Sequence, residues 1–385
     1  MIGLAWALRD FGAPSRRRNA LAAGASILGA TASDARAAST GATNTPPREQ
    51  EPSPMPLRDL AAARGLRIGA AVAARPLATD AAYREVLARE FSSVTCENVM
   101  KPGYLQPSRG RFDFAEADAT VAFAAANGMT VRGHVLAWHN QNPPWLDRAV
   151  AAGDDPAGIL RDHVTGVLAH YRHDAPAPVP DWDVVNEALL DTGALRDTPW
   201  ARALGRGYLA QAFRWAHEAD PDARLFYNDY GAEGLGRKSD AVHALLRELR
   251  DDDVPVHGVG LQMHVGIGTG RWPEPSALAA NVARLRDLGL EVHVTEVDVK
   301  LQTGTGSEAE RLEEQARVYA AILATCLAAG VTSFTTWGFT DAHSWIPGFT
   351  GKPDGALPFD TAYRPKPAYH AMATTLRSAP LPASP

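Results

Sequence analysis

The feature of this sequence that most restricts its fold is a regular alternation of short apolar segments with longer segments of helical periodicity. Eight apolar, β-branched segments are expected to be strands, at 67–73, 91–97, 130–138, 181–187, 224–230, 256–264, 291–299 and 333–340. Helices are expected at 80–91, 115–127, 159–171, 201–219, 239–250, 276–288, 308–329 and 367–377. Strands that alternate with helices of this length predict right-handed βαβ units and a parallel sheet. Eight such units predict an α/β fold of the TIM-barrel type, (β/α)₈, in one domain.

A doubly wound open sheet is the alternative fold for such a pattern. It would typically have a glycine-rich phosphate turn after its first strand. The segment that follows Arg67 has a single glycine, Gly69, and no GxGxxG motif. The closed barrel is therefore favoured, and no nucleotide cofactor is predicted.

The first 56 residues differ in composition from the rest of the chain. Three arginines, Arg16 to Arg18, precede a mildly apolar run at 20–32 and the small-x-small triplet Ala35-Arg36-Ala37. This order is typical of a signal peptide over residues 1–37, and the arginines indicate a twin-arginine export signal. A disordered tail with a chance arginine cluster is the alternative. Residues 38–56 are rich in Ser, Thr, Pro and Glu and are expected to form a flexible leader, so that the folded domain spans 57–380.

Charge and cysteine content exclude several classes of function. The net charge is −6, and the sequence after the arginine cluster has no basic stripe that would bind nucleic acid. The only two cysteines, Cys96 and Cys326, are expected in the barrel wall and on an outer helix, and thus unpaired. No CxxC or HExxH spacing predicts a metal site. We expect an exported, periplasmic or secreted monomer that, after signal removal, does not bind membranes.

Polar residues gather at the carboxyl ends of the predicted strands, where a barrel of this kind holds its active site. The amino-terminal ends are not expected to hold a comparable cluster. Glu187 and Glu296 end the fourth and seventh predicted strands. Burial of a carboxylate is costly without a partner or a role, so this pair predicts either acid–base chemistry or, as the rival, a metal site. Trp138, Trp337 and Trp345 lie at or beyond strand ends, as in sites that bind sugar rings.

The alternation of side chains along a strand predicts which residues share a direction. Glu296 and Asp298 have the same parity, and so do Gln262 and His264. If Glu296 faces the barrel axis, the valines at 292 and 294 should fill the interior layers below it. His293 should then face the outer helices as a structural residue.

Seven motifs resemble those of glycoside hydrolase family ten, in the order that the family has them. They are ENVMK (97–101), GHVLAWHNQ (133–141), DVVNE (183–187), NDY (228–230), GLQMH (260–264), TEVD (295–298) and TWG (336–338). The match runs from about Leu57 to Ala379. The resemblance implies a retaining endo-β-1,4-xylanase on a (β/α)₈ barrel, which acts on xylan and xylo-oligosaccharides without a cofactor.

The resemblance also implies roles for individual residues. Glu187 matches the general acid/base and Glu296 the nucleophile, with His264 and Asp298 as supports of the nucleophile. Asn186 matches the residue that binds the 2-hydroxyl group at the cleavage point, and Tyr230 matches a position toward the leaving group. The non-reducing side of the cleft is expected to consist of Glu97, Asn98, Lys101, His134, Trp138, Gln141, Gln262, Trp337 and Trp345. One departure lies after Lys101, where the family usually has tryptophan and this chain has Pro102-Gly103.

Two other functions remain possible on the same barrel, namely hydrolysis of cellulose or mixed-linkage glucan, and non-catalytic sugar binding. For hydrolysis with retention, the two carboxyl groups should lie about 5–5.5 Å apart. The acid must hold a proton, so burial and the nearby negative charge are expected to raise the pKa of Glu187.

Overall fold

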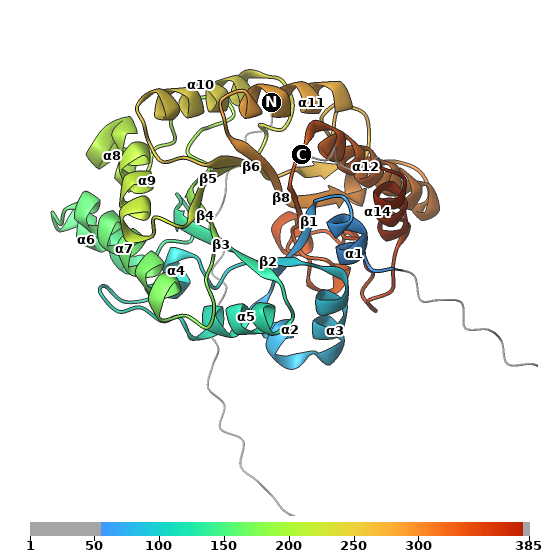
Figure 1. Cartoon of the computed structure of the whole chain (residues 1–385), viewed down its shortest axis with the longest axis horizontal. Coiled ribbons are helices and arrows are strands. Elements are labelled where there is room, and N and C mark those ends of the chain that lie inside the picture. Colours follow the sequence, from blue (N-terminus) through green and yellow to red (C-terminus); the bar gives the residue numbers. More distant parts are fainter. Residues whose placement is uncertain (1–54, 380–385) are drawn as a thin grey trace, which may run out of the picture. The chain divides into compact units, whose positions relative to one another are not determined.

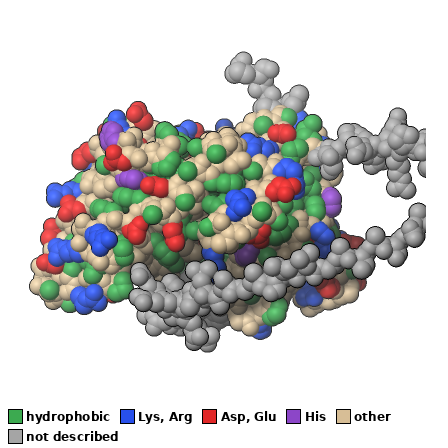
Figure 2. All heavy atoms as spheres, turned by 90° about the horizontal axis from the view of Figure 1, so that it is seen from below, with side chains coloured by type: hydrophobic (Ala, Val, Ile, Leu, Met, Phe, Trp, Pro, Cys, Tyr) green, Lys and Arg blue, Asp and Glu red, His purple; other side chains and the backbone are tan. Residues whose placement is uncertain are grey.

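The computed structural model describes residues 55–379, and these form a closed barrel of parallel strands surrounded by helices (Figure 1). The expected signal peptide, and all of the expected leader except its last two residues, lie outside the described residues. Within the described part, no helix is both long and apolar enough to cross a membrane. On the face shown in Figure 2, acidic and basic side chains are interspersed, with no basic stripe across it.

Eight strands form the barrel wall, as the sequence predicts. They are β1 (Arg67–Val72), β2 (Ser93–Cys96), β3 (Thr130–Ala137), β4 (Asp181–Asn186), β5 (Arg224–Asp229), β6 (Gly258–Leu261), β8 (Glu291–Lys300) and β9 (Ser333–Thr336). Neighbours along the chain pair in parallel, and β1–β9 and β6–β8 pairing closes the ring. A short extra strand, β7 (His264–Gly266), pairs with the upper part of β8 through the register His264 to Asp298. The prediction of a (β/α)₈ barrel is therefore confirmed.

The helices that cover the wall follow the predicted ranges closely. The main outer helices are α3 (Ala81–Glu90), α5 (Ala115–Ala126), α7 (Pro156–His173), α9 (Tyr208–Ala219), α10 (Arg237–Asp251), α11 (Pro275–Arg286), α12 (Glu308–Ala329) and α14 (Pro367–Ser378). Shorter helices lie before β1 or in loops, at α1 (Leu57–Ala62), α2 (Ala74–Thr79), α4 (Pro102–Leu105), α6 (Pro144–Ala151), α8 (Pro199–Leu204) and α13 (Ile346–Thr350). The expected single helix at 201–219 is divided into α8 and α9, because Gly205 adopts a positive φ of 60°.

Local sequence signals explain where the longest helix begins and ends. Ser307 caps α12 and accepts a hydrogen bond from the Glu310 backbone, while the Glu310 carboxylate accepts one from the Ser307 backbone. This reciprocal capping satisfies two N–H groups that would otherwise lack partners. Gly330 then ends the helix in the left-handed conformation, with φ 80°.

Three strands that carry functional residues contain one extra residue relative to a neighbour. The register shifts between His134 and Ala137 in β3, between Asp183 and Val185 in β4, and between Val294 and Val297 in β8. Such bulges reverse the alternation of side chains beyond them. Two nearby residues of one strand can therefore both face the barrel axis although their parity differs.

The bulge in β8 overturns the expected direction of His293. Nδ1 of His293 lies 3.0 Å from an Arg132 nitrogen on β3, and its ring stacks on Phe226 of β5, 4.5 Å away. Because β3 and β5 are not neighbours of β8, these contacts cross the barrel interior. His293 thus faces inward, and the adjacent Val292 and Val294 face the outer helices rather than the interior.

Charged side chains gather at the amino-terminal ends of the strands and in the barrel interior, contrary to the expectation for these strand ends. Arg67 pairs with Asp181 at 2.7 Å, and Arg224 pairs with Glu291. Farther up, Arg132 binds Asp183, with Nε 3.1 Å from Oδ2. Asp183 is only 1% exposed. Arg132 and Asp183 are buried and need each other as partners, whereas the side chains of Arg67, Arg224 and Glu291 remain partly exposed.

Both cysteines are buried and unpaired, as expected, with Cys96 at the end of β2 and Cys326 in α12. Burial raises the pKa of each thiol to about 12. They behave as small apolar residues of the wall and of the outer layer, respectively.

Candidate active site

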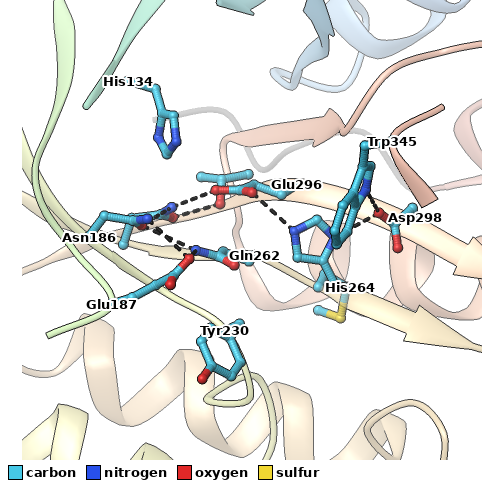
Figure 3. Close-up of polar contacts among 12 residues, drawn as sticks. His134, Asn186, Glu187, Tyr230, Gln262, His264, Glu296, Asp298 and Trp345 are labelled. Carbon is cyan, nitrogen blue, oxygen red and sulfur yellow. Dashed lines mark hydrogen bonds and ion pairs between the residues drawn. The ribbon is translucent and has the colours of Figure 1, made fainter. Parts of the chain in front are cut away.

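The polar residues predicted at the carboxyl ends of the strands come together at one mouth of the barrel (Figure 3). Glu187 follows β4 directly, and Glu296 lies in the upper half of β8. Both residues are buried, with 5% and 4% of their surfaces exposed. Between them lies a set of amide side chains that contacts both carboxylates, so the two glutamates share one site.

Glu187 uses its two carboxylate oxygens differently. Oε1 accepts hydrogen bonds from Nδ2 of Asn186 at 3.1 Å and from Nε2 of Gln262 at 3.0 Å. Oε2 is buried without a hydrogen-bond partner among the described residues and lies 3.7 Å from Nδ1 of His139. One oxygen is thus held in place, while the other is available to a bound molecule.

Glu296 has partners for both of its oxygens. Oε1 accepts a hydrogen bond from Nδ2 of Asn228 at 2.7 Å, and Oε2 lies 3.1 Å from Nε2 of His264. The other ring nitrogen of His264 lies 2.7 Å from Oδ2 of Asp298. Burial alone would lower the pKa of His264, but the carboxylates of Asp298 and Glu296 outweigh it and raise this pKa to about 10. This raised pKa favours the protonated form of His264, which is held between the carboxyl groups of Asp298 and Glu296.

Three amides connect the two glutamates. Oδ1 of Asn186 accepts hydrogen bonds from Asn228 at 2.9 Å and from Gln262 at 3.2 Å. Asn228 in turn contacts Glu296, and Gln262 contacts Glu187. A network in which every amide is engaged keeps both carboxylates in fixed orientations.

The expected rise in the pKa of Glu187 does not occur. Burial raises this pKa, but the hydrogen bond from Gln262 and the charges of His139 and Arg196 together lower it below its usual value. The expectation considered only burial and the negative neighbour. It left out the amide donors at Oε1 and the effects of His139 and Arg196.

The residues expected on the non-reducing side form a contiguous group beside Glu187 and Glu296. Nζ of Lys101 donates to Asn98 at 3.1 Å and to Gln141 at 2.7 Å, and Gln141 also donates to Asn98. Nδ2 of Asn98 donates to Glu97 at 3.3 Å. Burial lowers the pKa of Lys101 to about 8, against the opposing effect of the nearby glutamates. Burial also raises the pKa of Glu97.

Aromatic rings border this group. Nζ of Lys101 lies 5.0 Å from the ring of Trp138 and 5.9 Å from that of Trp337. His134 contacts both indoles, and its Nδ1 lies 3.0 Å from Oδ2 of the buried Asp183. Trp345 packs on His264 and donates from Nε1 to Asp298 at 2.8 Å. These rings provide flat apolar faces next to fixed donors and acceptors, which is the composition of a sugar site.

The departure from the family pattern after Lys101 is accommodated by a short helix. Pro102 begins α4, and the Gly103 N–H donates to the Gln141 carbonyl at 2.9 Å. A Cβ atom at Gly103 would lie 2.6 Å from that same oxygen, so only glycine fits without a shift. Pro102-Gly103 therefore keeps Lys101 and Gln141 together without tryptophan.

Tyr230 lies on the opposite side of Glu187, beyond β5 (Figure 3). Its hydroxyl accepts a hydrogen bond from Arg196 at 3.2 Å. Nζ of Lys238 lies 3.4 Å from the centre of its ring and 2.8 Å from Oδ1 of Asp229. Tyr230 is thus held from two sides.

Sequence reasoning missed four residues that contact this site. Asn228 bonds Glu296 directly, and His139 lies beside Glu187. Both occur inside recognised motifs, and that placement could have identified them. Arg196 and Lys238 lie in a loop and at a helix start without periodicity, so no sequence signal marked them.

The chain is similar in sequence and in fold to known proteins of one family. Residues 56–375 match the family model described as glycosyl hydrolase family 10. Over 321 residues the chain is 41% identical to endo-1,4-beta-xylanase B of Thermotoga neapolitana, covering 83% of this chain and 90% of that protein. Over 323 residues it is 37% identical to an exoglucanase of Acetivibrio thermocellus, covering 81% of this chain but only 29% of that protein. The crystal structure of xylanase 10B from Thermotoga petrophila RKU-1 in complex with xylobiose superposes with a TM-score of 0.77 at 39% identity, covering 85% of this chain and 98% of that one.

Proposed function

The chain belongs to glycosyl hydrolase family 10, and from this premise we propose that it is an endo-acting xylanase that cleaves β-1,4-xylosidic bonds with retention of anomeric configuration. The observation that carries the proposal is the pair of buried glutamates linked by shared amides at the barrel mouth. The xylanase names of relatives, and the xylobiose in the Thermotoga petrophila structure, support xylan as the substrate.

In the first step, Glu296 attacks the anomeric carbon as the bond from that carbon to the leaving oxygen breaks. Glu187 donates its proton to the leaving oxygen, and the product is a glycosyl ester of Glu296. His264 and Asn228 keep the attacking carboxylate oriented. The Glu187 oxygen without a protein partner, Oε2, is the one that we assign to the leaving oxygen.

In the second step, water attacks the same carbon from the side that the leaving group has vacated. Glu187, now a carboxylate, takes the proton from that water and regains its starting state. Glu296 is released as a carboxylate, so the two inversions give net retention. No group beyond the protein and water is required.

The first test is substrate choice and stereochemistry together. The purified protein is incubated with xylan and, separately, with a soluble cellulose derivative, and the first anomer released is followed by NMR. We expect the β-anomer from xylan and much slower release from the cellulose derivative. The reverse preference would favour a glucanase, which is the second candidate because one relative is named an exoglucanase.

The second test removes the proton from position 187. In the variant Glu187→Gln we expect turnover of xylan to fall by about 10²–10⁴-fold, the range that a general acid or base contributes. Binding of xylo-oligosaccharides, measured by calorimetry, should persist because the amide retains the shape of the side chain. The exposed Glu218→Gln on α9 serves as the control. Near-normal turnover by Glu187→Gln would refute the assigned role.

We also propose that residues 1–37 direct export by the twin-arginine route. Support comes from the consecutive Arg16, Arg17 and Arg18, followed by an apolar run and a small-x-small triplet. Replacing Arg16 and Arg17 by lysine should leave unprocessed protein inside a bacterial host, as measured by mass spectrometry of cell fractions. Equal processing of both forms would contradict this route.

A further inference from the structure

Arg196 joins the backbone of Glu187 to the side chain of Tyr230. It lies in the loop between β4 and α8, and its Nε donates to the Glu187 carbonyl oxygen at 2.9 Å. A terminal nitrogen of the same guanidinium donates to the Tyr230 hydroxyl at 3.2 Å and to the Leu189 carbonyl at 3.4 Å. One rigid, planar group therefore contacts both the acid/base residue and the leaving-group side.

The Glu187 backbone needs such an anchor because its conformation is unusual. Its φ is 56°, in the left-handed region that residues with a Cβ seldom adopt. The Glu187 N–H donates to the Asn228 carbonyl at 2.8 Å, and Arg196 holds its carbonyl group. The Arg196 loop is itself secured, since its N–H donates to the Ala188 carbonyl at 2.7 Å. Because the N–H and the carbonyl group of Glu187 are both hydrogen-bonded, the backbone that carries its carboxyl group is fixed.

Tyr230 is equally fixed from its other face. Lys238, 5% exposed, lies against its ring and pairs with Asp229, whose Oδ1 also accepts a hydrogen bond from the Tyr230 N–H at 2.9 Å. These contacts fix the ring of Tyr230, and its hydroxyl group meets Arg196 at a fixed position. The Arg196 charge, moreover, acts on the Glu187 carboxyl group.

We propose that Arg196 is a positioning residue for acid catalysis. Through its hydrogen bonds to both residues, Arg196 couples the position of Tyr230, on the leaving-group side, to the orientation of the Glu187 carboxyl group. The inference rests on the proposed function, in which Glu187 protonates the leaving oxygen. A displaced acid loses much of its effect, since an error of about 1 Å can cost about a hundredfold in rate. Loss of Arg196 should thus slow the departure of leaving groups that need a proton.

The test compares two leaving groups in the variants Arg196→Met, Arg196→Lys and Tyr230→Phe. Xylohexaose has a sugar leaving group that requires protonation, whereas dinitrophenyl β-xylobioside has one that departs without it. For Arg196→Met we expect kcat/KM on xylohexaose to fall by about tenfold to a hundredfold, and on the aryl substrate by less than about threefold. Arg196→Lys and Tyr230→Phe should show smaller losses with the same selectivity.

Arg202→Met is the matched control, because Arg202 belongs to the adjacent α8 and pairs only at the surface with Asp197, at 2.8 Å. It should retain normal rates on both substrates. A second readout is the pH profile: the alkaline limb of kcat/KM should move to higher pH in Arg196→Met and stay in place in Arg196→Lys.

Equal losses on the two substrates, or no loss on xylohexaose, would overturn the proposal. If Arg196→Met does not fold, as judged by circular dichroism, Arg196→Lys and Tyr230→Phe decide by the same comparison. Failure of the wild-type protein to cleave xylohexaose would instead refute the proposed function, which separates the two outcomes.

Discussion

At the scale of single residues, the site depends on how three amides divide their hydrogen bonds between two carboxylates. Asn186 and Gln262 donate hydrogen bonds to Glu187, and Asn228 donates one to Glu296. Asn186 also accepts hydrogen bonds from the other two amides. His264 adds a positive charge on the Glu296 side only. The two glutamates therefore differ in their surroundings although both are buried, and such a difference separates a nucleophile from an acid.

The surroundings that lower the pKa of Glu187 predict a difference between two pH profiles. A sugar over Glu187 would exclude water and place the leaving oxygen, a hydrogen-bond acceptor, beside Oε2, which favours the protonated form. The alkaline limb of kcat, which reports the bound state, should then lie at higher pH than that of kcat/KM, which reports the free enzyme. Steady-state rates on xylohexaose, measured from about pH 3 to pH 9, compare the two limbs. Coincident limbs would contradict this prediction.

Residues differ in how far the sequence alone could identify them. Glu187 and Glu296 stood out because each ends an apolar strand and lies in a recognisable motif. The structure brings them together with every other predicted site residue, while the assigned catalytic roles remain predictions. Arg196 could not be predicted, because its importance comes from a hydrogen bond to a backbone carbonyl, which no side-chain pattern encodes.

At the scale of elements, strand ranges were predicted to within a few residues, but side-chain directions in β8 were not. Simple alternation from Glu296 predicted that Val292 and Val294 face the barrel interior. Because of the bulge between Val294 and Val297, His293 faces the interior instead. A bulge depends on pairing with neighbouring strands, so the sequence of one strand does not reveal it. In β4 and β8 alike, the bulge lies close to a glutamate of the site and sets its direction.

The contact between α4 and the Gln141 loop predicts a large effect of a small substitution. In Gly103→Ala, the new methyl group would meet the Gln141 carbonyl, so the loop must shift. We expect a loss of about 1–3 kcal/mol in the free energy of unfolding and a raised KM, because Lys101 and Gln141 separate. Urea denaturation and steady-state kinetics measure the two effects.

Gly207→Ala provides the control for that substitution. Gly207 has an ordinary φ of −61°, and a Cβ atom added there would have no neighbouring atom within 4 Å. It should change neither stability nor KM appreciably. An unchanged KM in Gly103→Ala would show that the loop adjusts without disturbing Lys101.

At the scale of the whole molecule, ion pairs and the stacked rings of Phe226 and His293 occupy positions where layers of branched apolar side chains were expected. The pairs run from Arg67, Arg224 and Glu291 at the lower end to Asp183 beneath His134. Removal of one partner of the buried Arg132–Asp183 pair would leave the other uncompensated, whereas the Arg224–Glu291 pair is partly exposed and contributes less. The sequence does not reveal these pairs, because each charge, considered alone, resembles a solvated strand end.

These ion pairs predict how stability depends on pH. The contact with His293, 3.3 Å between its Nε2 and a Glu291 oxygen, and the neighbouring Arg224 lower the pKa of Glu291 from 4.5 to about 2 in spite of partial burial. Its folded-state pKa is below its unfolded value, so the contribution to stability is complete above about pH 4.5 and is lost as the pH falls toward 2. Glu291→Gln should lower Tm at neutral pH and flatten the decline of Tm in that acidic range.

Circular dichroism melting curves at a series of pH values test the prediction for Glu291, with the exposed Glu313→Gln on α12 as the control. The control should follow the wild-type curve. A parallel decline in Glu291→Gln would show that other carboxyl groups dominate the acid transition.

The two buried thiols have a practical consequence. In the native state neither Cys96 nor Cys326 can react with a soluble thiol reagent, because both are inaccessible and protonated. Labelling must therefore await an opening event. One sulfur belongs to the strand wall and the other to the outer helical layer, so their separate modification rates would time the exposure of each layer. The two cysteines of the wild-type chain thus report separately on the opening of the strand wall and of the outer helical layer.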